Sequence, residues 1–187
     1  MSVMSSNSDS SPRRERFFDP AADAPAARHA KRILQLLLAQ DGSTTRLCES
    51  VAGGAVSLHV RHQAATADVP ESVRAALPGT RFIERITSLS AHGEVMMDNL
   101  AYIALQGLDE SLQHDLEAGR LPIGHLLTRL WVRREAWPQA EALQQRLWND
   151  VGLPDAPATR AYRIVTPEGP RMLIAETYRR GMLQEPR

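Results

Sequence analysis

The segment between residues 81 and 105, RFIERITSLSAHGEVMMDNLAYIAL, constrains the fold more than any other part of the chain. It reads as two long strands joined by a tight turn at AHGE, residues 91–94. A glycine-containing turn between two strand-like stretches is a strong local signal for a β-hairpin. Strands joined by hairpins form an antiparallel sheet, so the chain is predicted to be built around such a sheet.

The rest of the chain supplies further strands and several helices. Apolar residues at helical spacing in AARHAKRILQLLLAQ predict an amphipathic helix over 26–40. Ser43 or Thr44 is suited to cap a second, short helix that ends at glycines 53 and 54. The other expected elements are a strand at 55–63, helices at 108–119 and from 123, a strand at 129–137, a helical segment with a Pro-rich loop at 138–158, and a hairpin at 160–180 that turns at PEG.

This order of elements predicts an α+β fold. We expect a single antiparallel sheet of about six strands with helices packed on it. Residues 1–25 are rich in Ser, Pro, Asp and Arg and are predicted to be a disordered N-terminal tail. Residues 26–187 are predicted to form one domain, as the length of 187 residues suggests.

The composition excludes several classes of function. The formal net charge is +0, from 22 Lys+Arg against 22 Asp+Glu, so no bulk attraction to nucleic acid or to an anionic membrane is expected. No apolar run approaches the length of a membrane span, and the single cysteine, Cys48, excludes an internal disulfide and fits a reducing cytoplasm. We therefore expect a cytoplasmic monomer or weak oligomer. Phosphate-binding, dinucleotide-binding, zinc-protease and nucleophile-elbow motifs are absent, so no cofactor and no metal is expected.

Two charged residues lie on strand faces that should point into the core. Glu176 shares its face with Met172, Ile174 and Tyr178. Arg85 lies between Ile83 and Thr87 on the core-facing side of its own strand. A buried charge is costly unless something pairs with it. One interpretation is a structural ion pair between Arg85 and Glu176. The other is a pocket in which the arginine holds a substrate carboxylate and the glutamate transfers a proton.

Two backbone positions are further candidates for a site. Gly119, Pro122 and Gly124 fix the chain around Ile123, where a new helix begins and presents free N–H groups able to bind an anion. The alternative is a simple connecting turn. Thr44 is similar, since it either only caps its helix or contributes its amide to a site.

Several short motifs, in this order along the chain, resemble the chorismate lyase family (chorismate–pyruvate lyase, 4-hydroxybenzoate synthase). They are ILQLLLAQDGSTTRLCES, VSLHVRHQ, ERITSLSAHGE, LPIGHLL and MLIAETY, and the likeness runs from about residue 28 onward. The resemblance implies a six-stranded antiparallel sheet whose helices cover an internal, solvent-shielded site. It also implies that Glu176 is catalytic, that Arg85 binds a carboxylate, and that the backbone at Ile123 and Thr44 contacts the same ring carboxylate.

The reaction implied by the resemblance needs neither cofactor nor metal. Chorismate loses its C4 hydrogen and its enolpyruvyl group, giving 4-hydroxybenzoate and pyruvate, and aromatisation drives the step. Glu176 either removes the C4 proton or protonates the departing ether oxygen, and the sequence leaves both roles open. The partner is then a small aromatic or cyclohexadiene carboxylic acid, and the product would feed ubiquinone synthesis.

The chain departs from the family pattern in three places. Asp98-Asn99-Leu100 stands where the better-known members have Ala-Gly-Arg, segment 138–158 is longer, and RRG at 179–181 follows the catalytic strand. These changes leave open a different chorismate-derived substrate in specialised metabolism, or a loss of activity.

Two alternatives to an enzyme also stay open. The first is a non-catalytic module that binds an aromatic acid or another effector, like the effector-binding domains of one class of bacterial transcription regulators. Those domains normally follow a winged helix-turn-helix domain, for which the predicted tail of residues 1–25 is too short. The second is a structural protein in which the Arg85–Glu176 pair is a buried salt bridge.

Overall fold

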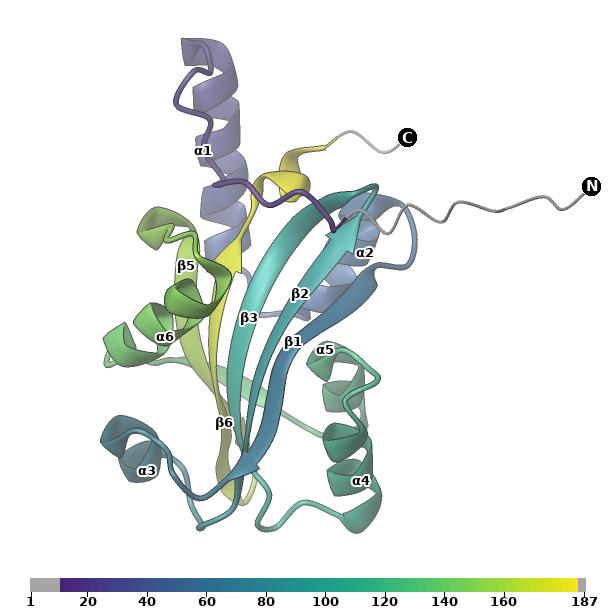
Figure 1. The fold of residues 1–187 in the computed structure, drawn as a ribbon, viewed down its shortest axis with the longest axis vertical. Coiled ribbons are helices and arrows are strands. Elements are labelled where there is room, and N and C mark those ends of the chain that lie inside the picture. Colours follow the sequence, from purple (N-terminus) through teal and green to yellow (C-terminus); the bar gives the residue numbers. More distant parts are fainter. Residues whose placement is uncertain (1–10, 185–187) are drawn as a thin grey trace, which may run out of the picture.

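The computed structural model describes residues 11–184 and confirms an α+β fold with one antiparallel sheet (Figure 1). The sheet has six strands in the order β1-β2-β3-β6-β5-β4. The strands are β1 (Ser57–Thr66), β2 (Phe82–Ala91), β3 (Glu94–Ala104), β4 (Arg133–Ala136), β5 (Thr159–Thr166) and β6 (Gly169–Tyr178). β3 and β6, the second strands of the two predicted hairpins, pair with each other at the centre of the sheet.

The hairpin between β2 and β3 turns at the predicted place. Its loop residues His92 and Gly93 both have positive φ, 52° and 79°. Positive φ at both positions gives a turn whose twist matches that of the two strands, and glycine adopts it without strain. The hairpin therefore fixes the register of the two longest strands.

The helices also begin and end where capping residues predict. Ser43, rather than Thr44, caps α2, and Gly53 and Gly119 end α2 and α4 in the left-handed conformation. The short helix α3 was not predicted. The helices are α1 (Ala24–Ala39), α2 (Thr44–Ala52), α3 (Glu71–Ala76), α4 (Glu110–Ala118), α5 (Ile123–Leu126) and α6 (Glu141–Val151), with 3-10 turns at Leu127–Arg129, Ala156–Ala158 and Arg180–Leu183.

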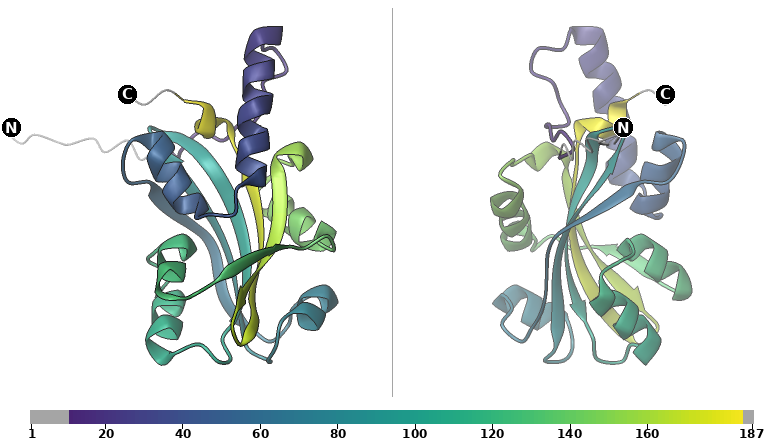
Figure 2. Two further views of the ribbon diagram at one scale, coloured as in Figure 1. Left: turned by 180° about the vertical axis from the view of Figure 1, so that it is seen from behind. Right: turned by 45° about the vertical axis from the view of Figure 1, so that its right-hand side comes forward.

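The helices cover both faces of the sheet. α3 and α6 pack on one face, and α1, α2, α4 and α5 pack on the other (Figure 2). No helix in residues 11–184 is long and apolar enough to cross a membrane. The second face carries both Arg85 and Glu176: Glu176 is in register with Asn99 and Thr87, and Arg85 lies two residues from Thr87 on the same face of β2.

The predicted disordered tail is wrong for residues 11–20. Phe17 is fully buried, and its backbone N–H donates to the carboxylate of Asp155 at 2.8 Å. Arg14 reaches the buried Asp98, with its Nε 3.1 Å from Oδ2. Ordering a segment costs conformational entropy, and a polar segment usually buries too little to offset that cost. Here the buried ring of Phe17 and the ion pair of Arg14 offset it. Residues 1–10 of the predicted tail lie outside the described residues.

The predicted strand at 129–137 is shorter in the structure. Only Arg133–Ala136 pair with β5, at the edge of the sheet, and Trp131 is 70% exposed. Residues 127–129 instead continue α5 as a 3-10 turn. The alternation of apolar and polar residues in 129–137 therefore predicts a longer strand than the four residues that pair with β5.

Candidate functional site

A row of polar residues crosses the sheet on the face covered by α1, α2, α4 and α5. Thr87 on β2, Asn99 on β3, Glu176 on β6 and Arg160 on β5 are successive cross-strand partners. Thr87, Asn99 and Glu176 are buried. One apolar cluster, with α4 and α5, lies on one side of the row, and a second, with α1 and α2, lies on the other. The polar row therefore marks where the two pairs of helices meet.

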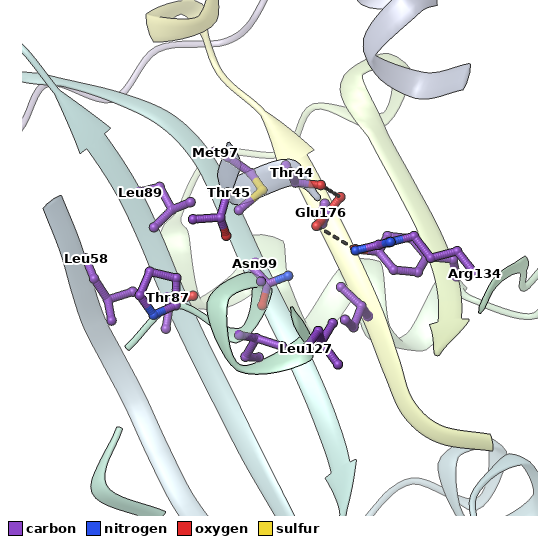
Figure 3. A pocket seen from close by; sticks show the side chains of 15 residues that line it. Thr44, Thr45, Leu58, Thr87, Leu89, Met97, Asn99, Leu127, Arg134 and Glu176 are labelled. Carbon is purple, nitrogen blue, oxygen red and sulfur yellow. Dashed lines mark hydrogen bonds between the residues drawn. The ribbon is translucent and has the colours of Figure 1, made fainter. Parts of the chain in front are cut away.

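A cavity of about 30 Å³ lies over this row. That volume holds about two water molecules. Figure 3 shows Thr87, Asn99 and Glu176 pointing toward it from neighbouring strands. The other lining residues come from both strands and helices: Thr44, Thr45, Leu58, Leu89, Met97, Pro122, Ile123, Gly124, Leu127, Arg134, Tyr162 and Ile174.

The first turns of α2 and α5 form the roof of the cavity. A Cβ on Gly124 would lie 2.4 Å from Thr45 Oγ1 and 2.9 Å from Ser43 Oγ, so only glycine allows this close approach. No side chain caps α5, and the amides of Ile123 and Gly124 have no partner within the helix. Ile123 and Gly124 both line the cavity, and an anion-binding role for the Ile123 amide stays a prediction.

Glu176 is surrounded by hydrogen-bond donors. The Thr44 hydroxyl donates to Oε2 at 3.0 Å, and the Tyr162 hydroxyl donates to Oε1 at 2.7 Å. Nε and Nη2 of Arg160 each lie 3.0 Å from Oε2. Because each of these partners is a donor, the carboxyl group of Glu176 acts as an acceptor through both oxygens.

Arg160 connects Glu176 to the end of helix α1. Its Nη1 donates to the carbonyls of Leu37 and Gln40. These carbonyls lie at the C-terminal end of α1, where no N–H group of the helix is available to them. The guanidinium also stacks on the rings of Tyr162 and Tyr178, 5.1 and 5.5 Å from their centroids. Burial acts to lower the pKa of Arg160, but the carboxylate of Glu176 and the two rings together raise it above its usual value.

The two tyrosines beside Arg160 stay protonated. Burial raises the pKa of Tyr162 well above its ordinary value and that of Tyr178 to about 12, and the Glu176 carboxylate acts in the same direction. Both phenols therefore act as donors: Tyr162 donates to Glu176, and Tyr178 donates to the Leu37 carbonyl at 3.0 Å.

Arg85 is fully buried on β2, two residues before Thr87 of the polar row. Its Nη2 donates to the carbonyls of Gly119 and Leu121, at 2.8 and 2.9 Å, in the segment that leads from α4 to the cavity roof. Nε and Nη1 have no hydrogen-bond partner among residues 11–184. Burial lowers the pKa of Arg85 to about 10.

The ion pair between Arg85 and Glu176, one of the two interpretations of the sequence, is not formed. β3 lies between β2 and β6, so Arg85 and Glu176 are not cross-strand neighbours. Arg160 on the adjacent strand β5 pairs with Glu176 instead. Within the described part of the chain, no carboxylate lies within ion-pair distance of Arg85. The buried guanidinium is therefore neutralised by no side chain.

Three of the four predicted site residues, Glu176, Ile123 and Thr44, line the cavity. Arg85 does not line it, and its guanidinium donates to the carbonyl of Leu121, the residue before the lining residue Pro122. Sequence reasoning missed Arg160. Arg160 and Tyr162 are two residues apart on β5 and therefore share one strand face. A charged residue on a core-facing strand face was the criterion that singled out Arg85, and it applies to Arg160 as well.

Arg134 and Tyr162 separate the cavity from the surface. Both line the cavity and also an outer pocket of about 220 Å³ between β4, β5 and the loop after α1. Arg134 bridges this gap, since its Nη1 donates to the Asp41 carbonyl at 2.8 Å and its guanidinium lies 5.7 Å from the Tyr162 ring. Among residues 11–184, no cluster of three or more His, Cys, Asp or Glu side chains could hold a metal ion.

No protein-family model and no curated protein sequence matches this chain. Among solved structures, a gene product of Staphylococcus aureus subsp. aureus N315 is similar with a TM-score of 0.41 and 12% identity, over 66% of this chain and 83% of that one. The ligand-binding domain of a candidate GntR-family transcriptional regulator from Bordetella bronchiseptica is similar with a TM-score of 0.39 and 16% identity, over 67% and 84%. These likenesses concern the overall fold and do not bear on function.

Proposed function

We propose that the cavity binds a small carboxylic acid on Arg85 and that the protein is a chorismate lyase-like enzyme. One observation carries the proposal: Arg85 is fully buried, no carboxylate neutralises it, and its Nε and Nη1 have no partner among the described residues. A buried cation without a counter-charge is costly, and each unsatisfied donor adds about 1–3 kcal/mol. A ligand carboxylate would supply both the charge and the acceptors.

The free part of the guanidinium defines how an acid would bind. Nη2 already donates to two carbonyls, so a ligand carboxylate would meet Nη1, and Nε would remain for a further acceptor. The free amides at Ile123 and Gly124, which follow Leu121 in the chain, would add donors from the roof. Charge-assisted hydrogen bonds of this kind are about twice as strong as neutral ones.

Glu176 is proposed to remove the C4 proton of chorismate. All its partners are donors, so it is arranged as a carboxylate that accepts a proton rather than as an acid that gives one. As the C4–H bond breaks, its electrons form the aromatic ring, the C3–O bond breaks, and the enolpyruvyl group leaves as the enolate of pyruvate. Protonation of that enolate completes 4-hydroxybenzoate and pyruvate. The motifs that resemble the chorismate lyase family support this choice of reaction.

The cavity must enlarge to accept a ring. Ligand sites usually measure roughly 300–1,000 Å³, far more than the cavity over the polar row. The roof is built from the first turns of two short helices that touch at Gly124, which makes α2 and α5 the elements that would separate.

The direct test is an assay of purified protein with chorismate. We expect 4-hydroxybenzoate and pyruvate in equal amounts. Glu176→Gln should lower the rate by about 10²–10⁴-fold, the usual contribution of a general base, while the exposed Glu168→Gln should not. Absence of both products from folded protein that binds 4-hydroxybenzoate would exclude the lyase.

The same contacts of Glu176 also suit a second function, binding of an aromatic acid without catalysis. Oε2 already accepts from Thr44 and Arg160 and Oε1 accepts from Tyr162, so the carboxylate has little acceptor capacity left for a substrate proton. In this case 4-hydroxybenzoate binds, chorismate is not converted, and Glu176→Gln changes binding little. The same assay combined with calorimetric titration distinguishes the two functions.

A further inference from the structure

Asn99 is a polar residue of the cavity whose side chain makes no hydrogen bond within residues 11–184. It is 6% exposed and sits at the centre of the polar row, between Thr87 on β2 and Glu176 on β6. Its Oδ1 is enclosed and has no hydrogen-bond partner among residues 11–184. Figure 3 shows the amide pointing to the cavity from the middle of β3.

The nearest polar neighbour of Asn99 is engaged elsewhere. Glu176 is bound by Thr44 from the roof and by Arg160 and Tyr162 from β5, which lies on the opposite side of β6 from β3. The carboxylate is therefore held by partners away from Asn99. The amide therefore makes no hydrogen bond within residues 11–184, and its enclosed Oδ1 would become accessible when the cavity enlarges.

An unused buried amide is unfavourable for the folded protein alone. A buried polar group without a partner costs free energy, whereas an apolar side chain of similar volume at this position would not. A ligand that hydrogen-bonds the amide would remove this cost.

We propose that Asn99 determines specificity by hydrogen-bonding a hydroxyl group of the bound acid. The proposal rests on the carboxylate site proposed above. A hydroxyl both donates and accepts, so it matches a free amide whichever end of the amide faces it. The ligand is then a hydroxylated carboxylic acid, with its carboxylate at Arg85 and its hydroxyl at Asn99.

The spacing of the two residues suits a single ring. Arg85 pairs with Ala101, two residues along β3 from Asn99. Two residues of a strand span about 7 Å, which is comparable to a six-membered ring with substituents at both ends. The sheet therefore offers a carboxylate-binding group and a hydroxyl-binding group one ring length apart.

The preference for a hydroxylated acid should be substantial. A site that hydrogen-bonds a hydroxyl rejects the analogue lacking it, because its own polar group is then left unpaired. For a neutral amide we expect a preference of about 10- to 100-fold.

The test is calorimetric titration of the full chain with benzoate and with 2-, 3- and 4-hydroxybenzoate. Wild-type protein should bind at least one hydroxybenzoate about 10-fold or more tightly than benzoate. In Asn99→Leu the ratio of these two affinities should fall to unity. Asn149→Leu, the same change on the exposed surface of α6, should keep the wild-type ratio.

The outcomes separate the two proposals. If all four acids bind wild-type protein equally, or if Asn99→Leu keeps the preference, the role of Asn99 is overturned while the carboxylate site stands. If none of the four acids binds, the carboxylate site and the role of Asn99 fall together. If Asn99→Leu does not fold, Asn99→Ala is titrated in its place and should show the same loss of preference.

Discussion

Arg85 and Arg179 are the two largest fully buried side chains in residues 11–184, and they differ in whether a carboxylate neutralises their charge. Arg179 follows β6, and its Nε lies 2.7 Å from Oδ2 of Asp98, with both side chains 0% exposed. Asp98 also accepts from the Ser88 hydroxyl at 2.6 Å. Arg85 donates only to backbone carbonyls. Among residues 11–184, Arg85 has two nitrogens without a partner and Arg179 has one, and of the two side chains only Arg179 pairs with a carboxylate.

A buried arginine that is paired within the protein stabilises the fold, whereas one without a counter-ion is suited to bind an anionic ligand. An ion pair made within the protein is complete on folding, and it leaves nothing for a ligand to add. A buried cation whose counter-ion is absent has an energetic deficit that an anionic ligand can offset. Asp98 and Asn99 show the same division, because adjacent residues of β3 point to opposite faces: Asp98 completes the cluster with Arg179, and Asn99 faces the cavity.

The largest effect is expected from removing Asp98. Asp98→Ala leaves the buried Arg179 without its counter-charge and should lower the free energy of unfolding by about 3–5 kcal/mol. Urea denaturation followed by circular dichroism measures this. The double variant Asp98→Leu with Arg179→Met removes the fully buried pair, leaves only the partly exposed Arg14 without its carboxylate, and should recover most of the loss. A loss below about 1 kcal/mol in the single variant would mean that Arg179 does not depend on the pair.

Removing Arg85 should have a smaller effect on stability and a large one on binding. Arg85→Met removes an uncompensated charge but leaves two carbonyls unpaired, so the free energy of unfolding should fall by less than about 2 kcal/mol. Binding of 4-hydroxybenzoate should weaken about 100-fold, because a charge-assisted contact is lost. Calorimetry on folded Arg85→Met checks this, and undiminished affinity would show that the acid binds elsewhere.

The dependence on pH follows from the same buried guanidinium. Burial lowers the pKa of Arg85 from its ordinary value to about 10, so the cation is present below that pH. Affinity for the acid should be flat from about pH 6 to 9 and fall as the pH rises through the folded pKa. The unfolded chain binds more protons between these two pKa values, so the stability contribution of Arg85 itself rises with pH there. Titrations at several pH values, with Arg85→Met as control, test the binding part.

The smallest effect is expected at Asn99. Asn99→Leu replaces an unpaired buried amide with an apolar group of similar size, so it should raise the free energy of unfolding by up to about 1 kcal/mol. Asp98→Leu, one residue away on the other face, should lower it. Urea denaturation of the two variants compares the faces directly, and a clear loss in Asn99→Leu would indicate that the protein uses the amide for folding.

Much of the architecture was readable from local patterns. Alternation placed Arg85 and Glu176 on core-facing rows, and the glycines at 53 and 119 marked the ends of two helices. The pairing of charges was not readable, because it depends on strand order. β5 lies beside β6 while β2 does not, so Arg160 rather than Arg85 meets Glu176.

The N-terminal segment shows a second limit of composition. Residues 11–20 look like a tail by composition, yet Phe17 and Arg14 bury specific groups against residues far along the chain. Such contacts involve single residues at long sequence separation, and no local periodicity reports them. The order of this segment therefore became apparent only in the folded structure.

The central claim is that Arg85 binds the carboxylate of a ligand while Arg179 serves the fold alone. The most direct measurement is the NMR spectrum of arginine Nε–H groups with and without 4-hydroxybenzoate, with Arg85 and Arg179 assigned from variants at each position. We predict that the Arg85 signal shifts on addition of the acid and that the Arg179 signal does not. An unchanged Arg85 signal in protein that binds the acid would contradict the claim.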